Sequence, residues 1–134
     1  MQVLGLDHVQ LAMPAGREAE ARRFYAGVLG MAEVARPAPL AARGGCWFEA
    51  PGTVVHVGVE EPFLPARKAH PAFVVADLEQ CRRTMIVAGS PVVADDSLAD
   101  VRRCYTADPF GNRIELIQQG DGFAERSAIA GRKA

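Results

Sequence analysis

The sequence is poor in cysteine and carries no excess charge of either sign. Its three cysteines, Cys46, Cys81 and Cys104, are odd in number and show no Cys-x-x-Cys spacing. A disulfide framework or a cysteine-rich zinc site is therefore not expected, and we interpret the thiols as reduced groups of a cytoplasmic protein. The 15 basic residues nearly balance the 16 acidic ones. No basic stripe gathers along the chain, which argues against a nucleic-acid partner.

Long hydrophobic runs are also missing. No apolar stretch approaches the roughly 20 residues that cross a bilayer, and the N-terminus lacks the charged start and apolar core of a signal peptide. We therefore expect no membrane partner. With 134 residues, 49% of them hydrophobic, the chain suits one domain or two small modules that share a core.

What the sequence does contain is a repeated order of elements. A strand, a helix and three strands occupy module one (residues 4–59), and the same order returns in module two (70–118). The expected strands are 4–13, 31–35, 46–50, 53–59, 70–76, 91–94, 101–107 and 113–118. The expected helices are 17–29 and one that begins after the capping residue Asp77. A proline-containing linker (60–69) joins the modules, loop 37–43 is long enough to rim a site, and the polar tail (119–134) is expected to fray.

This order predicts an α+β fold: two tandem βαβββ modules form a curved mixed sheet, with helices on its outer face. The segment Asp108–Asn112, DPFGN, is a strong turn signal because Pro109 fixes φ and Gly111 permits positive φ.

All three histidines of the chain fall on predicted strands with the same parity. They are His8, His56 and His70, and Glu115 has the matching position on a fourth strand. Since alternate strand residues share a face, four inward nitrogen or oxygen donors would form a metal cup. Such donors suit a divalent transition metal such as Ni, Co, Zn, Mn or Fe.

Other residues are weaker candidates. Tyr105 shares parity with Arg103 and could donate a hydrogen bond to substrate, and one of Trp47 and Phe48 should line the cup because neighbours on a strand face opposite ways. Four basic residues could clamp an anionic substrate: Arg43, Arg67, Lys68 and Arg103. We expect the cysteines, including Cys104, to be small core residues rather than nucleophiles.

Four motifs, HVQLAM, RRFYAGVLGM, AHPAFVVADL and YTADPFGNRIELI, together resemble the vicinal-oxygen-chelate superfamily. Its members include glyoxalase I, methylmalonyl-CoA epimerase, extradiol dioxygenases, fosfomycin-resistance enzymes and bleomycin-binding proteins. The resemblance implies metal ligands at His8 and His56 in module one and at His70 and Glu115 in module two. The position of His56 is usually Glu or Gln in the lyases and isomerases, so this chain departs from their pattern.

The resemblance implies a metal-dependent lyase or isomerase of glyoxalase type that chelates neighbouring oxygens of a small-molecule substrate and stabilises an enolate or enediolate. Glu115 would be the proton-transfer base, and His56 and Tyr105 would be further catalytic residues. If His56 stays off the metal, a two-histidine, one-carboxylate triad leaves room for an Fe(II) extradiol dioxygenase. The upstream histidine of the extradiol signature is absent, since residues 97–99 are Ser-Leu-Ala.

A third alternative is a non-enzymatic protein that binds an aromatic compound or an antibiotic, as in bleomycin resistance. Bleomycin binders typically lack ligands at these positions, which favours an enzyme. The resemblance also implies a homodimer, because in these families the cup often closes by pairing modules between subunits.

Overall fold

The structure is a computed structural model that describes residues 1–120. The chain divides into two compact units. The first is Met1–Lys68 together with Asp108–Asn112, and the second is Ala69–Ala107 with the chain from Arg113 onward. The division falls at the end of the predicted linker. Most of the tail that is expected to fray, residues 121–134, lies outside the described residues.

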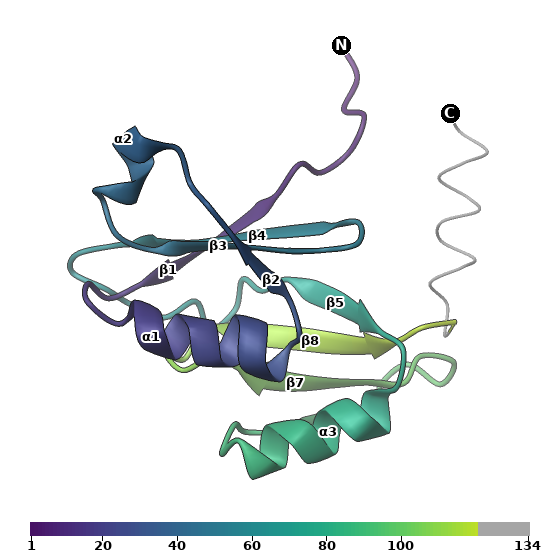
Figure 1. The fold of residues 1–134 in the computed structure, drawn as a ribbon. Coiled ribbons are helices and arrows are strands. Elements are labelled where there is room, and N and C mark those ends of the chain that lie inside the picture. The colour runs from purple at the N-terminus through teal and green to yellow at the C-terminus, as the bar shows by residue number, and fades with distance from the viewer. Residues whose placement is uncertain (121–134) are drawn as a thin grey trace. The chain divides into compact units, whose positions relative to one another are not determined.

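The first unit is a four-stranded mixed sheet with three short helical segments. Its sheet order is β1-β4-β3-β2, with β1 and β4 parallel and the other pairs antiparallel (Figure 1). The elements are β1 Val9–Met13, α1 Glu18–Ala21, η1 Arg22–Val28, β2 Ala32–Val34, α2 Ala38–Ala41, β3 Cys46–Ala50 and β4 Thr53–Val59.

The second unit repeats this sheet. Its order is β5-β8-β7-β6, again with one parallel pair, β5 and β8. The elements are β5 Ala72–Val75, α3 Leu78–Val87, β6 Val93–Asp95, β7 Arg103–Ala107 and β8 Arg113–Gln118. Asp77 caps α3 as predicted, because its Oδ1 accepts a hydrogen bond from the Gln80 amide at 3.0 Å. The α+β class and the tandem βαβββ order are therefore confirmed.

Three local predictions need correction. The first helix changes at Arg22 from an α-helix to a π-helix, in which the Leu29 amide bonds to the Phe24 carbonyl five residues back. Apolar spacing cannot separate these forms, since both keep one face buried. Loop 37–43 contains the helical turn α2. Strands β1 and β5 begin after His8 and His70, so these histidines precede the strands rather than lie on them.

The alternation predicted for the strands decides the core. In the first unit Val55, Val57 and Phe48 are fully buried, whereas His56 and Trp47 on the opposite face are half-buried. Tyr25 of η1 stacks on Phe48 with ring centroids 5.3 Å apart, so the helix covers the apolar face. In the second unit Ile114 and Leu116 are buried, and Figure 1 shows α3 beside β7 and β8. Each sheet therefore leaves its polar face uncovered by its own helix.

The predicted turn Asp108–Asn112 forms and is tied to the first unit by buried hydrogen bonds. Gly111 adopts a φ of 91°. The Asp108 carboxylate, 5% exposed, accepts hydrogen bonds from the Tyr25 hydroxyl at 2.7 Å and from the Phe110 and Asn112 amides at 2.9 Å. The Asn112 side-chain amide donates to the Ala12 carbonyl at 2.8 Å. These contacts explain why the turn, which lies in module two by sequence, groups with the first unit.

Replacing Tyr25 with phenylalanine should lower the free energy of unfolding by about 2 kcal/mol, because a hydrogen bond to a buried carboxylate is lost. Burial and the Asp108 charge raise the pKa of Tyr25 well above 10. The folded state therefore holds this proton above pH 10 while the unfolded state loses it. Stability from Tyr25 is full below pH 10 and declines as the pH rises beyond it.

Urea denaturation at pH 8 and at pH 10–11 measures both effects. The parent should lose more stability over this interval than Tyr25→Phe. Tyr105→Phe is the matched control, because no hydrogen bond of the Tyr105 hydroxyl is found among the described residues. If the parent and Tyr25→Phe lose the same stability between pH 8 and pH 10–11, the alkaline loss does not come from Tyr25.

Among residues 1–120 no helix combines the length and the apolar character needed to cross a membrane.

Candidate active site

The predicted donor residues form two pairs that occupy the same place in the two sheets. In the first unit Gln10 of β1 lies opposite His56 of β4, and His8 stands two residues before Gln10. In the second unit Ala72 of β5 lies opposite Glu115 of β8, and His70 stands two residues before Ala72. The two donor pairs, His8 with His56 and His70 with Glu115, are thus equivalent by strand register. An aromatic residue faces the second member of each pair: Trp47 opposite His56 and Tyr105 opposite Glu115.

His70 and Glu115 lie within direct contact. The His70 Nε2 atom is 3.1 Å from Glu115 Oε2, and the carboxylate is only 6% exposed. Glu115 Oε1 accepts a hydrogen bond from Arg103 Nη1 at 3.0 Å. Arg103 also pairs with Asp95 at 3.0 Å and donates to the Ser97 hydroxyl at 2.9 Å. The hydrogen bond to Glu115 is the main cause that raises the pKa of Arg103, so this guanidinium stays charged beside the carboxylate.

His8 and His56 stack on each other. Their ring centroids are 4.1 Å apart and their planes differ by 24°. Trp47 covers the other side of His56, with centroids 3.9 Å apart and planes only 3° from parallel. Burial, and next the neighbouring His8, lower the pKa of His56. His56 is therefore a neutral imidazole near pH 7, as a metal ligand or a general base must be.

The donor set fits a divalent transition metal in kind, and one pair fits it in spacing. Two ligands each about 2.1 Å from one ion lie about 3.0–3.4 Å apart in octahedral to tetrahedral geometry. The 3.1 Å between His70 Nε2 and Glu115 Oε2 falls in this range, as it does in that of a hydrogen bond. The stacked rings of His8 and His56 do not converge, because imidazole lone pairs lie in the ring plane. A shared ion would need His8 to rotate. Its side chain is 37% exposed, and besides the ring contact with His56 it pairs with its neighbour Asp7 at 2.8 Å. Within residues 1–120 the side chains as placed bring no three His, Cys, Asp or Glu groups around one point.

Tyr105 lies on the same side of its sheet as Glu115, as its parity predicts. Its ring meets the His70 ring edge-on, with centroids 5.5 Å apart, and the Arg113 guanidinium lies 3.9 Å from its centroid. Of the two aromatic candidates on β3, Trp47 shares the face of His56 while Phe48 is buried on the other.

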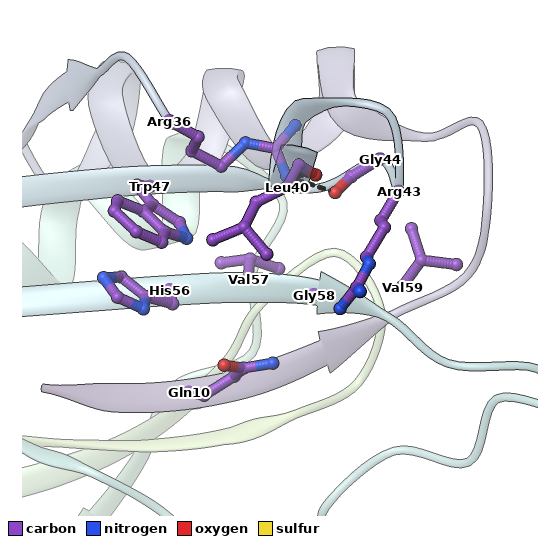
Figure 2. Close-up of a pocket in the computed structure, with 10 residues that line it drawn as sticks. All are labelled: Gln10, Arg36, Leu40, Arg43, Gly44, Trp47, His56, Val57, Gly58 and Val59. Atoms are coloured by element: carbon purple, nitrogen blue, oxygen red, sulfur yellow. Dashed lines mark hydrogen bonds between the residues drawn. The ribbon is translucent and has the colours of Figure 1, made fainter. Parts of the chain in front are cut away.

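A cavity of about 270 Å³ opens beside His56 within the first unit. Figure 2 shows Trp47 and His56 face to face at one end, Leu40 in the middle and Arg43 at the other end, with Arg36 above Trp47 and Leu40. The lining residues are Gln10, Arg36, Leu40, Arg43, Gly44, Trp47, His56, Val57, Gly58 and Val59. Arg43 was a sequence candidate for binding an anion, but Gln10, Arg36 and Gly58 were missed. Gly58 offered a signal, since a glycine inside a strand often marks close approach of another group.

The cysteines are not placed for nucleophilic chemistry. Cys46 and Cys104 are 1% and 0% exposed, Cys81 is half-buried, and all three are free thiols. Burial raises the pKa of each thiol. They therefore stay protonated near neutral pH, as expected of core residues.

Paired βαβββ units with matched donor pairs define a vicinal-oxygen-chelate protein, and comparison with known proteins agrees. Residues 10–117 match the family model of the glyoxalase-like domain. The chain therefore belongs to the glyoxalase-like family of this superfamily. A solved structure of a glyoxalase family protein from Bacillus anthracis is 46% identical, with a TM-score of 0.83, over 88% of this chain and 97% of that one.

Two more distant structures share the fold. The fosfomycin resistance protein FosX from Listeria monocytogenes is 15% identical with a TM-score of 0.72, over 93% of this chain and 99% of that one. A glyoxalase/dioxygenase from Nostoc punctiforme is 23% identical with a TM-score of 0.63, over 81% and 88%. No curated protein matches the sequence. Members of the superfamily are often enzymes, but these likenesses leave the reaction open.

Proposed function

We propose that the chain is a metal-dependent glyoxalase-like enzyme, a lyase or isomerase that acts on a small molecule with two neighbouring oxygens. The proposed metal ligands are His8, His56, His70 and Glu115. The observation that carries the proposal is that the two donor pairs occupy equivalent positions in the two sheets. Folding of each sheet alone does not require metal-binding side chains at these positions.

A bound divalent ion would polarise both substrate oxygens and stabilise the negative charge of an enolate or enediolate. The protein's own groups set up the rest of the reaction. Arg103 holds Glu115 Oε1, so Oε2 remains as the oxygen that binds the ion or takes a substrate proton. Tyr105, whose ring contacts that of His70, would donate a hydrogen bond from its hydroxyl to the substrate.

Metal affinity tests the ligand assignment. His8→Ala and His70→Ala should each weaken Co²⁺ or Zn²⁺ binding by at least about tenfold, because losing even an outer partner of a metal ligand costs that much. Calorimetric titration, with metal analysis of protein purified without chelator, gives the measurement. Asp7→Asn is the control, because it removes the charge that pairs with His8 at 2.8 Å and keeps the imidazole. Parent-like metal binding by both alanine variants would rule out the assignment.

The contact between Tyr105 and His70 also fits the runner-up, an Fe(II) extradiol dioxygenase with His56 off the metal. His56 lies between the His8 and Trp47 rings, which is compatible with a position off the metal. Oxygen consumption by ferrous protein with a panel of catechols separates the two functions. Rapid uptake that depends on catechol would replace the lyase or isomerase proposal with the dioxygenase one.

A further inference from the structure

The two units differ where the cavity lies, although their strands follow the same register. Gly58 stands two residues after His56, and Ile117 stands two residues after Glu115. Gly45 precedes Cys46, and Arg103 precedes the equivalent Cys104. Ile117 is 8% exposed, so the second unit fills this region with side chains. The first unit has glycine at both positions and a cavity of about 270 Å³.

Close contacts require glycine at both positions, and Gly58 itself lines the cavity. Gly45 has a φ of 91°, and a Cβ there would lie 2.3 Å from the Val57 carbonyl oxygen, so no other residue fits. A Cβ on Gly58 would meet the Gln10 amide nitrogen at 2.6 Å. The Gln10 side chain therefore lies directly over Gly58 and presents an amide to the cavity.

The charged side chains that line the cavity favour an anion, and the nearby Glu18 carboxylate is engaged by the Gly45 amide at 3.2 Å. Its described lining contains two arginines and no acidic residue. Arg36 is committed to the protein, because its guanidinium donates to the carbonyls of Leu40 and Ala41 at 3.2 Å and also to that of Gly44. Arg43, by contrast, is exposed and has no hydrogen-bond or ion-pair partner among residues 1–120. Figure 2 shows its side chain extending toward β4 near Gly58.

We propose that this cavity binds a carboxylate of the substrate, held by Arg43 and the Gln10 amide, while Leu40 and Val59 contact the adjoining carbon chain. A single guanidinium matches a carboxylate in charge and in fork geometry. The substrate is then a small acid whose carboxylate is separate from the two neighbouring oxygens of the reacting group. The statement about the two neighbouring oxygens rests on the proposed function.

Trp47 provides the measurement, because it lines the cavity and is the only tryptophan of the chain. Its fluorescence would be followed during titration with 2-oxoglutarate and with 2-oxopentanoate, in the presence of Co²⁺. Both probes carry neighbouring keto and carboxylate oxygens on the same carbon chain, and only 2-oxoglutarate has a further carboxylate. The parent should bind 2-oxoglutarate at least about tenfold more tightly, as expected for a hydrogen-bonded charge pair.

Arg43→Gln should abolish this preference by weakening 2-oxoglutarate binding alone. Arg83→Gln, the same change at an exposed position of α3, should keep it. Gly58→Ala should fold, because its methyl group meets only the flexible tip of Gln10, and it should weaken both probes by narrowing the cavity. Three results would each overturn the proposal. The parent shows no preference for 2-oxoglutarate, or Arg43→Gln retains the preference, or 2-oxoglutarate does not bind at millimolar concentration.

The same titrations keep this proposal apart from the proposed function. His70→Ala should weaken both probes equally if the metal binds their keto-acid oxygens, and it should leave the ratio of the two affinities unchanged. The ratio therefore reports on Arg43, and the absolute affinities report on the metal ligands. Affinities that do not respond to Co²⁺ or to His70→Ala would count against the metal proposal while the ratio still judges the carboxylate site.

Discussion

Replacing Asp108 with alanine should lower the free energy of unfolding by about 4 kcal/mol or more. The Asp108 carboxylate is buried and accepts four hydrogen bonds, two on each oxygen. Its removal leaves the Tyr25 hydroxyl and the backbone amides of Phe110 and Asn112 without this acceptor. Unsatisfied buried donors each cost about 1–3 kcal/mol. Urea denaturation followed by Trp47 fluorescence measures the loss.

Asp108→Asn separates the carboxylate from the shape of the side chain. Asparagine has nearly the same volume, but its NH₂ group would take the place of a carboxylate oxygen that accepts hydrogen bonds. Two donors would then face each other, either at Tyr25 or at Asn112. We therefore expect a loss of about 2 kcal/mol, between the parent and the alanine variant. An alanine variant within about 1 kcal/mol of the parent would show that the turn contributes little to the first unit.

Replacing Arg103 with methionine should lower the free energy of unfolding by about 3 kcal/mol. The change removes the cation that pairs with Glu115 and leaves a carboxylate that is only 6% exposed beside His70. Breaking a buried ion pair on one side typically costs 3–5 kcal/mol. The partial exposure of Arg103, at 17% of its side chain, places the expected loss at the lower end.

Arg82→Met is the matched control, because Arg82 makes a 3.8 Å surface ion pair with Glu79, whose side chain is 69% exposed. Such pairs contribute about 0–1 kcal/mol. If Glu115 is a metal ligand, saturating Co²⁺ should raise the Tm of Arg103→Met more than that of the parent, since the ion replaces the lost positive charge. Equal metal effects on the two proteins would argue against Glu115 as a ligand.

Much of the fold could be read from the sequence because it depends on local pattern. The predicted strands 46–50, 53–59 and 113–118 match β3, β4 and β8 residue for residue. Alternation predicted that Trp47 and Phe48 face opposite ways, and the structure decided that Trp47 shares the face of His56 while Phe48 is buried. The strand bounds were less accurate at β1 and β5, where the pattern continues through His8 and His70 but strand pairing begins later. Alternation describes extended chain, and only a partner strand decides where the ladder starts.

The candidate site divides in the same way. The sequence itself determined the donor types and their equivalent positions in a repeat, because period and spacing are properties of the chain. Tertiary structure alone decided that Arg103 pairs with Glu115 and that His8 and Trp47 enclose His56. It further decided that Gly58 and Arg43 line one cavity. It also decided that Asp108–Asn112 joins the first unit, through contacts with Tyr25 and Ala12. These features join residues far apart in the chain, and no local pattern encodes which distant group will be the partner.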